Sequence, residues 1–141
     1  MKLTNNFTLE ELIWSDTANR LHINNTPSKE VIDKLKKLAT DILQPIRDTY
    51  GVPIKISSGY RCPVLNKKIG GVRNSQHVLG EAADLVVGDV VQNLELFNLI
   101  KTMIERGEIT VGQLINEYGG KWVHVSLPRT NKKNNQIINI Y

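Results

Sequence analysis

Three side chains that can bind a metal constrain this chain more than any other feature, because a fold must bring them together from distant positions. His77 and Asp84 lie seven residues apart, and His124 follows forty residues further on. Two imidazoles and one carboxylate can hold a zinc ion and leave its fourth position open for water, the ligand count of a catalytic rather than a structural site. The chain has only three histidines. The spacing is therefore compatible with one Zn2+ per chain at these residues.

For His77 and for His124, the alternative is a buried histidine that makes hydrogen bonds in the core and binds no metal. His124 lies in the apolar run Trp122–Leu127, where a buried polar ring requires a partner. A metal ion would supply that partner. Gly80, between His77 and Asp84, lets the chain turn there because glycine accepts backbone angles that other residues resist.

Length and composition indicate one ordinary domain. The 141 residues, 40% hydrophobic and 23% charged, suit a single domain over 1–141 with a core at about 7–127 and a polar tail at 128–141. No apolar run approaches the length of a membrane span, so we expect no membrane insertion. The polar residues 1–6 do not begin a secretory signal peptide. We therefore expect synthesis in the cytoplasm without export by that route.

The net charge of +4 and the isoelectric point of about 9.2 fit either solubility or attraction to a polyanion. The basic residues are scattered, aromatic residues make up only 6% of the chain, and no recognition motif accompanies the charge. We therefore expect no nucleic-acid partner and keep basic nucleic-acid binding as a lesser alternative. Cys62 is the only cysteine, which excludes an internal disulfide and a metal site built from paired cysteines.

The apolar spacing predicts an α+β fold with helices packed on a small, mostly antiparallel sheet. The first helix is expected from the Thr8/Glu11 capping box to about residue 14. A second begins at Ser28 and carries an apolar stripe at 31–46, and Pro45 should kink or interrupt it near its end. A third is expected around residues 94–104. Strands are expected at 53–58, 83–87, 111–117 and 122–127, with a long irregular stretch at 59–76. Residues 136–141 either add an edge strand or stay loose.

Glu117 is the candidate catalytic base. If residues 118–121 form a four-residue turn, Glu117 pairs with Trp122 in a hairpin, and Glu117, Trp122 and His124 share one face. The carboxylate would then reach a water molecule held at His124. A rim carboxylate that improves solubility is the alternative. Glu81 is a weaker candidate because its position on the strand faces away from Asp84.

Arg61 and Ser75 are the candidate substrate-binding residues. Arg61 follows a strand end and Gly59, where a guanidinium can project into a cleft and bind a carbonyl or carboxylate oxygen. Ser75 can donate a hydrogen bond to a peptide carboxylate. A surface arginine and a turn serine are the alternatives.

Together these residues resemble the zinc D-Ala-D-Ala carboxypeptidase family. That family also contains phage L-alanyl-D-glutamate endopeptidases and shares its fold with the signalling domain of hedgehog proteins. Its pattern Ser-x-His-x-x-Gly-x-Ala-x-Asp, followed by Trp-x-His, is matched at Ser75, His77, Gly80, Ala82, Asp84, Trp122 and His124. The opening Phe7–Leu12 is similar to a phage and bacterial branch. The resemblance extends over residues 7–126.

The resemblance implies that His77, Asp84 and His124 bind zinc, that Arg61 polarises the scissile carbonyl, and that Ser75 helps to hold the carboxylate end of the substrate. It implies an endolysin-like enzyme that cuts peptidoglycan stem peptides, either as a D-Ala-D-Ala carboxypeptidase or as an L-Ala-D-Glu endopeptidase. We expect a monomer that acts on the cell wall after phage-type release or as part of a virion.

One position departs from the family pattern. Many members carry an acidic residue three positions before the last histidine, and Lys121 stands there. A charged lysine cannot act as a general base. The chain is therefore either an enzyme that uses Glu117 instead, or a non-catalytic, zinc-stabilised module that binds the cell wall.

Overall fold

Five strands form one sheet in the computed structural model, which describes all 141 residues. The strands are β1 (Lys55–Ser58), β2 (Ala82–Val86), β3 (Gln113–Glu117), β4 (Trp122–Ser126) and β5 (Gln136–Asn139). Their order is β1-β2-β4-β3-β5, and every neighbouring pair is antiparallel except β3 and β5, which are parallel. The predicted α+β fold with a mostly antiparallel sheet is confirmed, and residues 136–139 form an edge strand.

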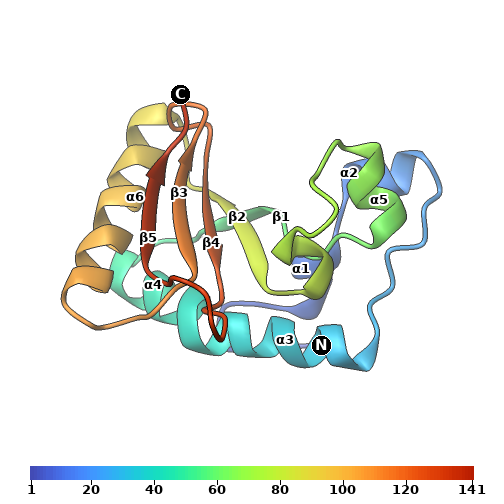
Figure 1. Cartoon of the computed structure of the whole chain (residues 1–141), viewed down its shortest axis with the longest axis horizontal. Coiled ribbons are helices and arrows are strands. Elements are labelled where there is room, and N and C mark those ends of the chain that lie inside the picture. The colour runs from blue at the N-terminus through green and yellow to red at the C-terminus, as the bar shows by residue number, and fades with distance from the viewer.

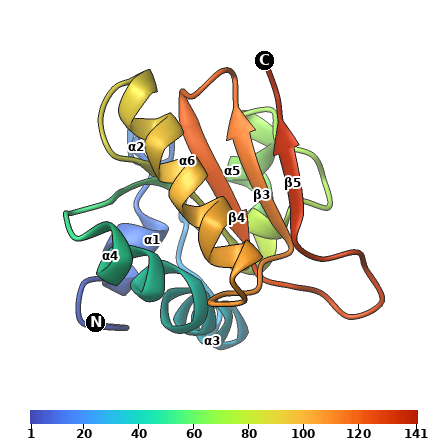
Figure 2. The same cartoon turned by 90° about the vertical axis from the view of Figure 1, so that its left-hand side faces the viewer.

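Helices lie on both sides of this sheet. They are α1 (Leu9–Ile13), α2 (Asp16–Arg20), α3 (Lys29–Leu38), α4 (Gln44–Tyr50), α5 (Pro63–Lys68) and α6 (Val90–Glu105), with a π-helical segment at Ala39–Leu43 and a 3-10 turn at Gln76–Leu79. In Figures 1 and 2, α6 covers one face of the sheet, whereas α2 and α5 lie beyond the opposite face. None of the helices combines the length and apolar composition that a membrane crossing needs.

Side-chain alternation gives the sheet one core face and one polar face. Leu85, Val123 and Leu114 are fully buried and belong to the hydrophobic core, which also includes Phe97 and Ile100 of α6. Burying each such side chain stabilises the fold by about 1.5–3 kcal/mol. The next residue along each strand points the other way, so the register aligns Asp84, His124 and Ile115 across β2, β4 and β3 on the face opposite α6.

The helix predicted over the apolar stripe at 31–46 is longer than expected. Regular α geometry is interrupted at Ala39–Leu43, two positions before Pro45, as the proline predicts. The helix does not end there, because Pro45 is the second residue of α4, which runs to Tyr50. The wider π turn accommodates the proline without loss of the apolar face. Gly51, at φ +84°, ends the helix.

The prediction of a wholly irregular stretch at 59–76 is wrong, and one helix was not predicted. Residues 63–68 form α5, which begins with Pro63 after the extended residue Cys62. Helix α2, whose N-cap is Ser15, was missed. Both helices have only five or six residues, too few for an apolar repeat to become visible in the sequence. The Thr8/Glu11 capping box and the Glu117–Trp122 pairing of the hairpin are both confirmed.

Candidate active site

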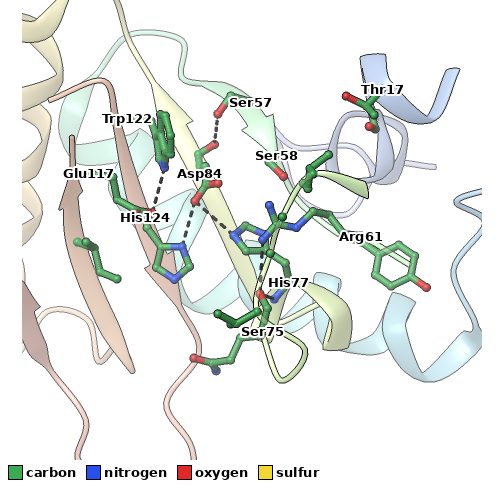
Figure 3. Close-up of a pocket in the computed structure, with 18 of the residues that line it drawn as sticks. Thr17, Ser57, Ser58, Arg61, Ser75, His77, Asp84, Glu117, Trp122 and His124 are labelled. Carbon is green, nitrogen blue, oxygen red and sulfur yellow. Dashed lines mark hydrogen bonds and ion pairs between the residues drawn. The ribbon is translucent and has the colours of Figure 1, made fainter. Parts of the chain in front are cut away.

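His77, Asp84 and His124 converge on the polar face of the sheet. His77 lies in the 3-10 turn, Asp84 on β2 and His124 on β4, and one ligand atom of each lies within 4.8 Å of the others. Asp84 Oδ1 is 3.3 Å from His77 Nε2 and 3.0 Å from His124 Nδ1 (Figure 3). The antiparallel pairing of β2 with β4 places Asp84 opposite His124, which explains how residues forty positions apart meet.

The surrounding backbone fixes the orientation of the His77 ring. His77 Nδ1 lies 2.8 Å from the carbonyl oxygen of Gly59. Because a carbonyl only accepts, Nδ1 carries the hydrogen, which leaves the lone pair of Nε2 for a metal ion, the usual arrangement of a metal-binding histidine. The backbone N–H of His77 donates to Ser75 Oγ at 3.1 Å. Gly80 then reverses the chain at φ +75°, so that β2 can begin.

The charge state of Asp84 suits a metal ligand. Burial by itself raises the pKa of this carboxyl group, but the imidazoles of His124 and His77 beside it outweigh burial and hold the pKa well below its ordinary value. An ionised carboxylate beside two imidazole nitrogens is a donor set that Zn2+ accepts. The three residues therefore fit a zinc ion, and all three line the same cleft.

A cleft of about 780 Å³ opens above these three residues. The sheet contributes Ser57, Gln113, Ile115, Glu117 and Trp122 to its lining. The connection between α1 and α2 and the start of α2 contribute residues 14–17, and the segment after α5 contributes residues 69–72 and 74. Arg61, Ser75 and Arg129 complete the polar part of the wall. All six residues predicted to form the site line this one cleft.

Glu117 lies on the cleft face, as the hairpin register requires. It pairs with Trp122, and its Oε2 accepts a 3.0 Å hydrogen bond from the indole N–H of Trp122. No other side chain bonds this carboxylate, so Oε1 remains free. Lys121 is exposed in the turn and is absent from the cleft lining. The acidic group available to the cleft is therefore at position 117 rather than at position 121.

Arg61 is half-buried in the wall of the cleft, and its N–H groups are incompletely used. Its Nη2 is 3.5 Å from Ser75 Oγ, and its Nε is buried without a protein partner. Burial lowers the pKa of the guanidinium, while the charges of Asp84 and Glu117 oppose that shift; arginine stays charged under such conditions. A buried cation with an unused donor suits a substrate oxygen.

Asn25 supports Arg61 and was not predicted. Its Nδ2 donates to the carbonyl oxygens of Ile13 at 2.9 Å and Tyr60 at 3.0 Å, and its Oδ1 accepts from the backbone N–H of Cys62 at 2.7 Å. One side chain thus binds the residues on both sides of Arg61. Asn25 lies in a polar loop remote in sequence from residue 61, and no local pattern marks it.

The weaker sequence candidates lie outside the metal cluster. Glu81 forms an ion pair with Lys34 at 3.3 Å and accepts from Gln76 at 3.2 Å, so its carboxylate is already occupied. His22 is exposed, and Cys62 is a free thiol at the N-cap of α5.

An α+β fold with a buried His–Asp–His cluster at the base of a cleft has the ligand set of a single-metal hydrolase. The model of one family, Peptidase M15, matches residues 5–136, and the chain belongs to this family. Peptidases of this family are zinc-dependent, so membership supports a metallopeptidase with a peptide substrate and agrees with the donor set. No curated protein matches the chain.

Proposed function

We propose that this protein is a zinc-dependent, endolysin-like peptidase that hydrolyses the stem peptides of bacterial peptidoglycan, as a D-Ala-D-Ala carboxypeptidase or an L-Ala-D-Glu endopeptidase. One observation carries the proposal. Three metal-ligand atoms within 4.8 Å of one another lie at the base of a cleft that Glu117 and Arg61 also line. A metal centre, a free carboxylate and an unsatisfied cation in one cleft are the groups that peptide hydrolysis needs.

His77 Nε2, Asp84 Oδ1 and His124 Nδ1 are the atoms that would hold the metal. Zinc bound there supplies Lewis-acid activation of water and of a peptide carbonyl. The hydrogen bond from His77 Nδ1 to Gly59 keeps the ring in the required tautomer.

Glu117 is proposed as the general base and then the general acid. Its Oε2 is fixed by Trp122, while its free Oε1 takes a proton from the attacking water and passes it to the leaving amine. Positioned proton transfer of this kind contributes about 10²–10⁴ in rate.

Arg61 is proposed to bind the oxygen on which negative charge develops. Its position in the cleft wall beside Ser75 supports this role. A charged donor placed in advance stabilises an oxyanion more strongly than water does, because it does not reorganise during the reaction. Ser75 would bind the carboxylate end of the substrate together with Arg61.

A non-catalytic, zinc-stabilised module that binds the cell wall is the second candidate, and Lys121 is the observation that favours it. The cleft geometry favours the enzyme instead, because Glu117 lines the cleft and Lys121 does not. The enzyme should release products from peptidoglycan, whereas the binding module should release none, so one experiment separates them.

That experiment combines elemental analysis of the purified protein with mass spectrometry of digested peptidoglycan. The enzyme is expected to hold one zinc per chain and to release D-Ala or whole stem peptides, and a chelator should stop the release. Zinc without any product would establish the binding module. The His77→Ala variant should lose its zinc, whereas His22→Asn, which changes the histidine outside the cluster, should keep it. Wild-type activity in His77→Ala would contradict the proposed site.

A further inference from the structure

Trp14 lines the cleft with an exposed ring that a hydrogen bond holds in place. The side chain is 57% exposed and lines the cleft. Its indole N–H donates to Asp16 Oδ1 at 2.9 Å. Trp14 is also the C-cap of α1, and Ser15 caps α2 by accepting from the N–H of Ala18. Two helix ends and a hydrogen bond thus hold a large aromatic face toward solvent, an arrangement that suits ligand contact more than packing.

The side chains that follow Trp14 in the chain are hydrogen-bonding groups. Ser15, Asp16 and Thr17 line the cleft together with Trp14. Ile115, Tyr118 and Trp122 of the sheet and its hairpin also line it, with the Tyr118 and Trp122 rings 5.2 Å apart. In Figure 3, Thr17 lies on the opposite side of the metal cluster from Glu117 and Trp122.

An aromatic face surrounded by hydroxyl and carboxylate groups has the chemistry of a saccharide site. The C–H groups on one side of a sugar ring carry a small positive charge and pack on the electron-rich aromatic face. The sugar hydroxyls donate to carboxylate oxygens and exchange hydrogen bonds with serine and threonine. An apolar peptide side chain would instead favour the part of the lining that Ile115 and Trp122 form.

We propose that Trp14 and Asp16 form a saccharide subsite that binds the glycan to which the peptide substrate is attached. This inference rests on the proposed function for the identity of the glycan, which in peptidoglycan is built from N-acetylated amino sugars. It gives the cleft a direction, with the glycan on the α2 side of the metal centre and the peptide extending toward β3 and β4.

The test uses the fact that the chain has only two tryptophans. A proton NMR spectrum therefore contains two indole N–H signals, and the Trp14→Phe variant assigns them by removing one. A peptide-free disaccharide of N-acetylglucosamine and N-acetylmuramic acid is titrated into the intact protein. The Trp14 signal is expected to shift in a saturable way, while the Trp122 signal stays in place.

Two variants and one control sharpen the result. Trp14→Ala should weaken disaccharide binding by at least about tenfold, followed by backbone amide shifts at residues 15–17. Asp16→Ala should weaken binding as well, because it releases the indole and removes an acceptor. Leu21→Ala changes a residue that is also exposed but lies outside the cleft lining, and it should leave binding unchanged.

Binding of the disaccharide needs no catalysis, so this test is separate from the test of the proposed function. Cleavage of glycan-free stem peptides by a protein whose Trp14 signal never shifts would overturn the saccharide subsite and leave the peptidase in place. A shift confined to Trp122 would also overturn it. A saturable Trp14 shift in the unaltered protein, together with weaker disaccharide binding by Trp14→Ala at the backbone amides of residues 15–17, would establish the subsite, whether or not the protein cleaves peptide.

Discussion

Asp84 and Glu117 are two carboxylates on the same face of the sheet, and their surroundings suit different roles. Asp84 is buried, and the two imidazoles beside one of its oxygens hold its carboxyl pKa low and keep it ionised. Glu117 is only partly buried and accepts one hydrogen bond from Trp122, so one of its oxygens remains available to water. When two acidic groups in one site have such different environments, one is typically a fixed ligand and the other carries a proton.

Replacing Glu117 with Gln tests the second of these roles. Glutamine can still accept from the Trp122 indole but cannot take a proton, so we expect unchanged zinc content and a turnover lower by about 10²–10⁴. Stem-peptide hydrolysis and elemental analysis of the same preparation measure both quantities. Lys121→Ala is the control, because Lys121 is exposed in the turn. Turnover equal to that of the unaltered protein would place the base at another residue.

At the scale of elements, the site depends on short connections that hold functional residues at strand ends. Asn25 binds Tyr60 and Cys62 and so fixes the segment that carries Arg61, while the N–H of Tyr60 also donates to the carbonyl of Leu12 at 2.8 Å. The loop before α3 and the end of α1 are thereby joined to the cleft wall. A residue that touches no substrate can therefore affect activity through position.

The Asn25→Ala variant should lose stability and activity together while it keeps its zinc. Leaving the partners of this amide unsatisfied costs about 1–3 kcal/mol in unfolding free energy, measured by urea denaturation. We expect kcat/KM to fall by about tenfold because Arg61 is less well positioned. Asn24→Ala is the matched control, since Asn24 makes only a local, exposed hydrogen bond to Thr26. Equal losses in the two variants would mean that Asn25 does not position Arg61.

Gly80 connects the turn that carries His77 to the strand that carries Asp84. Its φ is +75°, and a Cβ there would lie 2.9 Å from both the Cγ1 and the carbonyl oxygen of Val31. Gly70 has a similar φ of +79°, but a Cβ added there would meet no atom within 4 Å. Alanine at either position costs about 1–2 kcal/mol for the left-handed backbone.

We therefore expect Gly80→Ala to destabilise the protein clearly more than Gly70→Ala does, and to weaken zinc retention as well. Thermal unfolding and competition with a chelator measure the two effects. Similar unfolding midpoints in the two variants would show that α3 yields to the added methyl group.

At the scale of the whole molecule, the metal cluster joins parts that are far apart in the sequence. His77 belongs to the segment that borders α5, whereas Asp84 and His124 belong to the centre of the sheet (Figure 1). A ligand that binds all three in the folded state, and not in the unfolded chain, stabilises the fold by mass action.

Removing zinc with a chelator should therefore lower the thermal midpoint, and adding zinc should restore it. At free zinc about a thousandfold above its dissociation constant, the gain is ~4 kcal/mol, which corresponds to roughly 10 °C for a domain of this size. Calorimetry with and without zinc measures the shift, and His77→Ala should show none. A midpoint that does not depend on zinc would exclude a tightly bound ion at this cluster.

Local spacing was sufficient wherever the relevant residues are close in the sequence. Turn chemistry and strand alternation are short-range effects, so the Glu117–Trp122 pairing, the capping box at Thr8 and the turn at Gly80 could all be predicted. The match to the Ser-x-His-x-x-Gly-x-Ala-x-Asp pattern is also a short-range feature, because the pattern covers one turn and the strand that follows.

Only the tertiary structure decided the contacts between segments that no local pattern connects. The amide of Asn25 around Arg61, the exposed ring of Trp14 in the cleft lining, and the short helices α2 and α5 all depend on how distant segments pack. A polar loop residue has many possible partners, and a five-residue helix is too short to be stable without the rest of the fold. The sequence by itself therefore determined which side chains lie on the same face of a strand or hairpin. Tertiary packing determined which distant residues those side chains contact.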